Sequence, residues 1–197
     1  MSVKQSKFLR TIVFLFQLVI KRIQKIVIDA VPEGTILDIG GGGEGIIAQI
    51  GRERVTAVDK FQSEIDGAKQ KAPEANWILA DAQNLDFSDG HFDSATSFFS
   101  IMYMSNKVKK EVFKEIYRVI SDEGEFWIWD ASISKEKGVF LVKIKVILPD
   151  QTVVRTGYGV SSKIQTVNSI KEMLEEVGFN VEIIESNKQW YFMKAKK

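Results

Sequence analysis

Cysteine is absent from the 197 residues of this chain, and histidine occurs once. Disulfide bridges and thiolate metal sites are therefore excluded, and a zinc ion would need carboxylates for most of its ligands. We predict no metal site. The sequence also lacks an apolar run close to the ~20 residues that a membrane-spanning helix requires. We expect a cytoplasmic protein.

An excess of either charge is missing as well. The chain has 27 basic and 26 acidic residues, a net charge of +1, so no overall field indicates a nucleic-acid partner. The distribution is uneven, because residues 1–28 hold six Lys or Arg and no acid. The 45% hydrophobic content is enough for the core of one domain.

Proline, glycine and acids are all missing between Phe8 and Ile28, where polar residues recur at helical spacing. This pattern predicts an N-terminal helix, and we assign residues 1–30 to a cap helix over the ligand cleft. Two other uses of the segment remain open. A basic amphipathic helix can lie on an anionic surface, so residues 7–28 could make peripheral membrane contact. The segment could also form a homodimer contact.

Glycine, by contrast, is concentrated at positions 40 to 43 and 45. The apolar run 35–39 before it predicts a buried strand, and residues 46–50 after it suit a helix. Glycine permits positive φ and a close approach of the backbone to a ligand. Free N–H groups at the start of the helix would attract a carboxylate or a phosphate. We therefore predict a ligand site at this loop.

Two cofactor classes fit the loop. Gly40, Gly42 and Gly45 satisfy the dinucleotide pattern G-x-G-x-x-G, and Asp59 follows at about the expected distance, which would suit a nicotinamide-dependent oxidoreductase. Asp38 argues against that class, because a carboxylate at the end of the strand would repel a pyrophosphate. A ligand with an amino-acid moiety and a sulfonium tolerates an acid there.

An acid, one apolar residue and then spaced glycines, as in Asp38 to Gly42, resembles the first motif of the class I S-adenosylmethionine (SAM) dependent methyltransferases, of the type 11-like domain. The likeness covers about residues 33–130 and 165–195. It departs at the last glycine, which comes one place late, after Glu44. It implies methyl transfer from SAM to a small-molecule or lipid-like acceptor. A non-catalytic SAM-binding regulatory module is the other possibility.

The resemblance also implies roles at the ends of the next strands. Asp59, which ends the predicted strand 54–59, would accept hydrogen bonds from the ribose hydroxyls; alternatively it caps the following helix. Asp81 and Ala82, after the strand 76–82, would contact adenine. The full predicted cofactor-binding set is Asp38, Gly40, Gly42, Gly45, Asp59, Lys60, Asp81, Ala82 and Ser97.

A catalytic residue is harder to choose. An oxygen or carbon acceptor would need a base, and the candidates are Tyr103, Asp130 and Tyr158. His91 is the one histidine, but it precedes the predicted strand 92–99 at the end remote from the cleft. We therefore interpret His91 as a surface turn residue.

The remaining pattern completes an α/β fold. We predict a doubly wound, Rossmann-like sheet of seven strands, mostly parallel with an antiparallel strand near the edge, over residues 31–197. A β-hairpin inserted at about 131–164, with arms at 140–148 and 152–160 around Pro149, either binds substrate or merely extends the sheet. The other predicted elements are helices at 63–71, 106–120 and 166–177 and strands at 125–130, 181–185 and 189–195.

Overall fold

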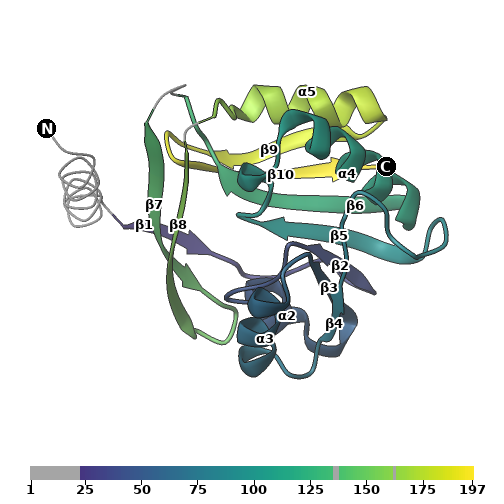
Figure 1. Cartoon of the computed structure of the whole chain (residues 1–197), viewed down its shortest axis with the longest axis horizontal. Coiled ribbons are helices and arrows are strands. Elements are labelled where there is room, and N and C mark those ends of the chain that lie inside the picture. Colours follow the sequence, from purple (N-terminus) through teal and green to yellow (C-terminus); the bar gives the residue numbers. More distant parts are fainter. Residues whose placement is uncertain (1–22, 135–137, 162) are drawn as a thin grey trace, which may run out of the picture.

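The computed structural model describes residues 23–134, 138–161 and 163–197, and most of the predicted N-terminal helix lies outside these ranges. A seven-stranded sheet has the order β4-β3-β2-β5-β6-β10-β9 (Figure 1). Its strands are β2 (Ile36–Ile39), β3 (Val55–Asp59), β4 (Asn76–Leu79), β5 (Phe92–Phe98), β6 (Ile120–Ala131), β9 (Asn180–Ser186) and β10 (Trp190–Lys196).

The direction of the strands agrees with the predicted sheet. The five strands from β4 to β6 pair in parallel, whereas β10 runs antiparallel to both β6 and β9. The antiparallel strand is therefore second from the edge. The strand order reverses between β2 and β5, and ligands bind open parallel sheets at the carboxyl ends of strands beside such a point.

Helices cover the sheet on both faces, as a doubly wound fold requires. They are α2 (Ile46–Gly51), α3 (Gln62–Lys71), α4 (Asn106–Val119) and α5 (Val167–Val177), with short 3₁₀ turns η1 (Arg52–Arg54) and η2 (Ile101–Tyr103). One buried cluster includes Ile47 of α2, and a second includes Phe113 of α4 and Leu174 of α5. The predicted α/β fold is confirmed.

The inserted hairpin belongs to a second sheet of three strands, in the order β1-β7-β8. Strands β7 (Val139–Ile147) and β8 (Val153–Ser161) are the two predicted arms, and β1 (Gln24–Val27) pairs with β7 in parallel. Ile144 and Val146 of β7 join the same buried cluster as α2. The interpretation of the hairpin as an extension of the main sheet is therefore wrong.

The prediction of a helix reaching Ile28 is also wrong at its end, because Gln24–Val27 is a strand. Ile26 is buried and pairs with Val146, whereas Lys25 and Val27 are exposed. The helical spacing of polar residues between Phe8 and Ile28 concealed the two-residue alternation of buried and exposed side chains in this strand. Pairing with a distant strand overrides local helix preference, especially for β-branched residues.

Strand β6 starts earlier than predicted, at Ile120, which pairs with Phe92. The register shifts before Glu125 pairs with Ser94. The backbone bends between these pairs, where Glu123 has a φ of 66° and Gly124 lies so close to the Asp93 carbonyl oxygen that a Cβ would approach it to 2.8 Å. The residues between the predicted helix and the predicted strand at 125–130 therefore form a bend within one strand.

Candidate active site

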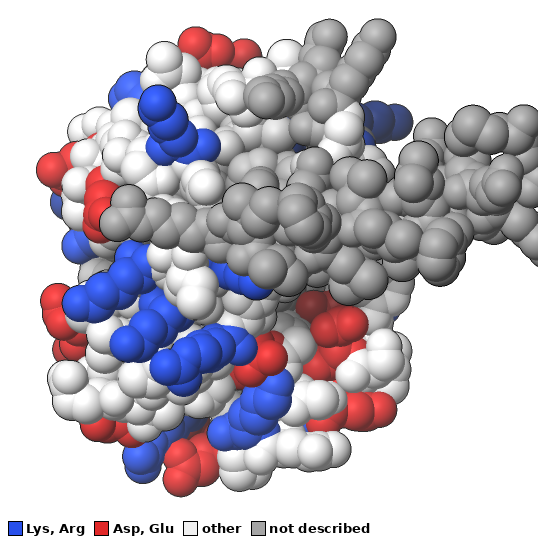
Figure 2. Space-filling view, turned by 90° about the vertical axis from the view of Figure 1, so that its left-hand side faces the viewer, with Lys and Arg blue, Asp and Glu red and all other residues white. Residues whose placement is uncertain are grey.

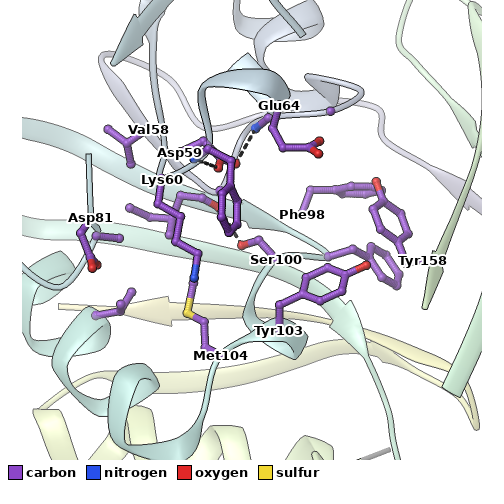
Figure 3. A pocket seen from close by; sticks show the side chains of 18 of the residues that line it. Val58, Asp59, Lys60, Glu64, Asp81, Phe98, Ser100, Tyr103, Met104 and Tyr158 are labelled. Atoms are coloured by element: carbon purple, nitrogen blue, oxygen red, sulfur yellow. Dashed lines mark hydrogen bonds between the residues drawn. The ribbon is translucent and has the colours of Figure 1, made fainter. Parts of the chain in front are cut away.

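A cavity of about 780 Å³ lies at the carboxyl ends of β2, β3, β4 and β5 (Figure 3). This volume is in the range of small-molecule sites. One side, the glycine-loop wall, comprises Gly40, Gly42 to Glu44 and the residues at and just after the ends of β3 and β4. The opposite side, the aromatic wall, comprises Phe98, Phe99, Tyr103 and Tyr158. In Figure 3, Lys60 and Asp81 lie on the left and the aromatic side chains on the right.

The glycine loop runs close against its neighbours. Gly40 has a φ of 66°, and a Cβ there would lie 2.5 Å from the Cβ of Ser100. The N–H groups of Gly40 and Gly41 both donate to the Val58 carbonyl, at 2.8 and 3.3 Å. Only a residue without a side chain fits this path.

The loop N–H groups are less free than the sequence suggested. Gly42 donates to Asp59, and Gly43 donates to the Glu64 carbonyl at 3.0 Å. The following helix, α2, is six residues long. The loop therefore offers shape more than unsatisfied donors, and its backbone is fixed by β3 and α3.

Asp59 lies at the centre of the glycine-loop wall. Its Oδ2 accepts a hydrogen bond from the Gly42 N–H at 3.2 Å, and its Oδ1 accepts one from the Phe61 N–H at 3.0 Å. Helix α3 begins after Phe61 and has no side-chain cap. The interpretation of Asp59 as a helix cap is therefore wrong, and its carboxylate lines the cavity.

Asp38 lies beneath the loop, 1% exposed, outside the cavity lining. Its Oδ1 accepts a hydrogen bond of 2.8 Å from the Thr96 hydroxyl. The pKa of this carboxyl is raised to about 7, chiefly by burial, against the lowering by the Thr96 hydrogen bond and with a smaller raising effect from the charge of Asp59. A Cβ on Gly41 would lie 2.5 Å from its Oδ2, so the glycine there makes room for the acid.

The other predicted cofactor residues divide into two groups. Lys60, Asp81 and Ala82 line the cavity, as do Gly40 and Gly42. Gly45 and Ser97 do not, since Gly45 lies at the start of α2 and the Ser97 hydroxyl is 2.7 Å from that of Ser100. Asp81 accepts hydrogen bonds from the N–H and side-chain amide of Gln83, which lower its pKa.

The aromatic wall is built by ring stacking between segments distant in sequence. Tyr158 of β8 stacks on Phe99, with ring centroids 4.9 Å apart and an interplanar angle of 10°, and Phe98 meets Phe99 edge-on. Tyr103 of η2 is 49% exposed. Burial raises the pKa of both tyrosines, so each phenol stays protonated at neutral pH.

Asp130, the third catalytic candidate, lies outside the cavity lining and is fully buried. Its Oδ2 accepts from the N–H groups of Ile101 and Met102, and its Oδ1 accepts from the Ala131 N–H and the Gln165 amide. Burial raises its pKa to about 6, against the lowering by these bonds. The carboxylate thus holds η2, which carries Tyr103, in place.

Glu64 is the functional candidate that the sequence did not reveal. It lines the cavity from the first turn of α3, and its Cβ lies where a Cβ on Gly42 would come within 2.5 Å. Among the described residues, no hydrogen bond or ion pair to its carboxylate is seen, whereas Glu44 pairs with Lys71 at 2.8 Å. Glu64 follows Asp59 by five residues and lies in the first turn of α3, the helix that faces the loop. This position in the sequence is the signal that could have identified it as a cavity residue.

The charge of the cavity is acidic. Four carboxylates line it, from Glu44, Asp59, Glu64 and Asp81, against the single ammonium of Lys60. A pyrophosphate would meet mostly like charge, whereas a sulfonium cation would not. Within the described ranges, no group of three His, Cys, Asp or Glu side chains could hold a metal ion.

Known proteins agree with this geometry. Residues 37–128 match a family model described as a methyltransferase domain. This region, just under half of the chain, is therefore similar to a methyltransferase domain. A SAM-dependent methyltransferase from Methanosarcina mazei shares the fold, with a TM-score of 0.63 and 20% identity over 85% of this chain and 94% of that one. These matches support SAM as the cofactor over the nicotinamide alternative.

Two curated relatives match a smaller part of this chain than the solved structure does. The biotin biosynthesis bifunctional protein BioHC of Teredinibacter turnerae is 28% identical over 53% of this chain and 22% of its own length. The demethylmenaquinone methyltransferase of Thermotoga maritima is 26% identical over 55% of this chain and 48% of its own length. The chain thus spans less than half the length of either relative.

Proposed function

We propose that the protein transfers a methyl group from SAM to a small, largely apolar acceptor of lipid-like character. The observation that carries this proposal is the aromatic wall, in which Phe98, Phe99 and Tyr158 contact one another and face the glycine loop. A flat apolar wall favours a planar or hydrocarbon acceptor, and most of the charged groups of the cavity belong to the opposite, glycine-loop side.

The cofactor lies along the glycine-loop wall in this proposal. Asp59 holds the ribose hydroxyls, and Asp81 and Ala82 contact the adenine. Lys60 borders the same wall. The predicted roles of Asp38, Gly45 and Ser97 become indirect, because all three lie outside the cavity lining and support the residues that form it.

Positioning supplies much of the catalysis. The sulfonium is already a good leaving group, so the protein has mainly to hold the acceptor atom in line with the methyl group. Tyr103 is suited to this task, because its phenol lines the cavity between η2 and β8, where the Gly159 backbone acts to lower its pKa against the raising effect of burial. The methyl group moves to the acceptor, and the sulfur retains the electron pair of the broken bond.

Glu64 is the base that we propose for an acceptor that must lose a proton. It is a cavity carboxylate without a partner in the described residues, and its charge contributes to the raised pKa of Tyr103. In Figure 3 its carboxylate lies on the same side as the aromatic residues. Tyr158 and Asp130 are less suited, since one is stacked and the other is enclosed.

The names of the two relatives leave the acceptor open. One is named a demethylmenaquinone methyltransferase, and the other is named for biotin biosynthesis. The aromatic wall favours the first kind of acceptor. A homodimer and membrane contact through residues 7–28 stay predictions, as does a cap helix, because residues 1–22 lie outside the described ranges.

Methyl turnover with labelled SAM tests the proposal. The panel should contain apolar acceptors, such as short-chain quinols, phenols and fatty acids, and polar ones, such as sugars and amino acids. We expect turnover with apolar acceptors alone. Turnover confined to polar acceptors contradicts the proposal, and S-adenosylhomocysteine binding without any turnover favours the regulatory module. A rise in melting temperature with S-adenosylhomocysteine but not with NAD is the accompanying binding check.

A further inference from the structure

The three-stranded sheet packs one face against the core, and its outer face is formed mostly by exposed and half-buried residues. Residues alternate along each strand, so that Ile26, Ile144 and Val154 face the core, while their neighbours face outward. Leu141 of β7 is outward but buried, so the open part of the face lies toward Ile147. The outward residues are Lys25 and Val27 of β1, Val139, Leu141, Lys143, Lys145 and Ile147 of β7, and Val153, Arg155, Gly157, Gly159 and Ser161 of β8.

Register brings the basic residues of this face together. Lys25 pairs with Lys145, which pairs in turn with Arg155, so three cations form a row across the sheet. Lys143 is two residues from Lys145 on the same face and lies opposite Gly157, which has no side chain. The three strands contain these four basic residues and no Asp or Glu.

Nothing in the described part of the chain neutralises this row. None of its cations takes part in an ion pair, and the carboxylate of Asp150 in the connecting turn accepts hydrogen bonds from Thr152. Like charges directly opposite one another destabilise a sheet. Figure 2, which looks onto this side of the molecule, shows Lys and Arg side chains gathered with few acids among them.

An apolar row runs beside the basic one. Val27 pairs with Ile147, and Ile147 pairs with Val153. Ile23 lies on the other side of the basic row, before the start of β1. Ile23, Val27 and Val153 are 55%, 46% and 39% exposed. Aliphatic side chains gain little from a nucleic-acid backbone, and this face offers no exposed aromatic ring for base stacking. They do gain from the boundary between lipid headgroups and acyl chains.

We propose that the outer face of the β1-β7-β8 sheet docks on an anionic phospholipid surface. The basic row contacts the headgroups, and the apolar row enters the boundary beneath them. Strand β8 is the edge of this sheet, and Thr156, Gly157 and Tyr158 line the cavity. Docking therefore brings the cavity beside the bilayer. The inference does not depend on methyl transfer, and vesicle binding without cofactor tests it separately.

Vesicle co-sedimentation of the full chain is the experiment. The vesicles are phosphatidylcholine alone, or phosphatidylcholine mixed with phosphatidylglycerol, each at low and high salt. We expect binding to the mixed vesicles alone, weakened by salt because screening shortens the range of the attraction. Binding to neither vesicle, or equally to both, overturns the proposal.

A triple variant, Lys25→Gln, Lys145→Gln and Arg155→Gln, removes the basic row. The partition coefficient should fall roughly fivefold for each lost charge and roughly 100-fold for all three. The matched control is Lys69→Gln, Lys107→Gln and Lys188→Gln, which removes the same charge from exposed positions elsewhere. The control should lose far less. Equal losses point to net charge, and undiminished binding of the row variant points to another segment; either result overturns the proposal.

Two further measurements keep the test decisive. Melting temperature and S-adenosylhomocysteine binding show whether each variant is folded, and the single variant Lys145→Gln, at the centre of the row, replaces the triple variant if the latter does not fold. Val153→Ser should weaken vesicle binding with the charges intact. Unchanged vesicle binding of this variant, together with tight binding of a single-stranded RNA oligomer, would assign the face to nucleic acid and overturn the proposal.

Discussion

The glycine-loop wall and the aromatic wall face each other across one cavity, but different interactions hold them. Asp59 and the loop are joined by backbone and carboxylate hydrogen bonds within the first two strand-helix units. Phe99 and Tyr158 are joined by ring stacking between β8 and the segment after β5. The first wall is polar and the second largely apolar.

The two walls also differ in how much of each lies in the matched region. Residues 37–128 contain the whole glycine-loop wall and Phe98, Phe99 and Tyr103 of the aromatic wall, but not Tyr158 of β8. Under the proposed function, the glycine-loop wall binds the cofactor and the aromatic wall binds the acceptor. Substitutions in the two walls should accordingly affect different constants.

Glu64→Gln should give the largest effect. It tests whether the two walls have separate roles, because Glu64 lies on α3 yet faces the aromatic wall. If it is the base, kcat should fall by about 10²–10⁴. Affinity for S-adenosylhomocysteine should change little, since Gln keeps the shape. Steady-state kinetics with an accepted substrate and calorimetric binding measure both. A loss of cofactor affinity at unchanged kcat would show that Glu64 contributes to cofactor binding with the glycine-loop wall and is not the base.

Asp38→Asn tests the electrostatics beneath the loop. The folded-state pKa, about 7, exceeds the ordinary 3.8, so the folded protein holds this proton more tightly than the unfolded chain does. The contribution of Asp38 to stability is therefore greatest below pH 4, falls between pH 4 and 7 and then stays level. Relative to the wild type, the variant should gain stability over that window, by at most about 4 kcal/mol.

Urea unfolding of both proteins at several pH values measures this difference. Asp130 has a raised pKa too, but it is present in both proteins and cancels. Parallel stability curves across the window would show that Asp38 is already ionised in the folded state.

Asp59→Ala probes the glycine-loop wall directly. Loss of charge-assisted hydrogen bonds to the ribose should cost roughly 1.5–3 kcal/mol, which is at least tenfold in S-adenosylhomocysteine affinity. Acceptor KM should be much less affected. Because Asp59 also bonds to Gly42 and Phe61, the apo protein should lose about 1 kcal/mol of stability. Isothermal calorimetry decides the matter, and unchanged affinity would remove Asp59 from the cofactor site.

Tyr158→Ala should have the smallest effect. It tests the aromatic wall, as Asp59→Ala tests the glycine-loop wall. Loss of the ring stack with Phe99 should raise acceptor KM roughly 2–10-fold, the value of an aromatic pair. Cofactor affinity should remain unchanged. Tyr158→Phe, which keeps the ring, is the control and should resemble the wild type. Equal KM values for the two variants would mean that the ring does not contact the acceptor.

Local patterns in the sequence predicted most of the elements and much of the glycine-loop wall. The spacing from Asp38 to Gly45 and the acids at Asp59 and Asp81 identified the loop and the strand ends, because short-range turn and strand chemistry determines them. The hairpin arms around Pro149 were also placed within a residue or two. The cofactor roles of these residues stay predictions.

Only the tertiary structure decided how distant segments meet. Gln24–Val27 read as part of a helix, yet it is a strand because β7 supplies hydrogen-bond partners and buries Ile26. Asp130 read as a candidate base, yet four protein donors enclose it. The stack of Tyr158 on Phe99 and the basic row across β1, β7 and β8 likewise depend on register between segments far apart. Such pairings are stabilised by long-range burial, which no local pattern encodes.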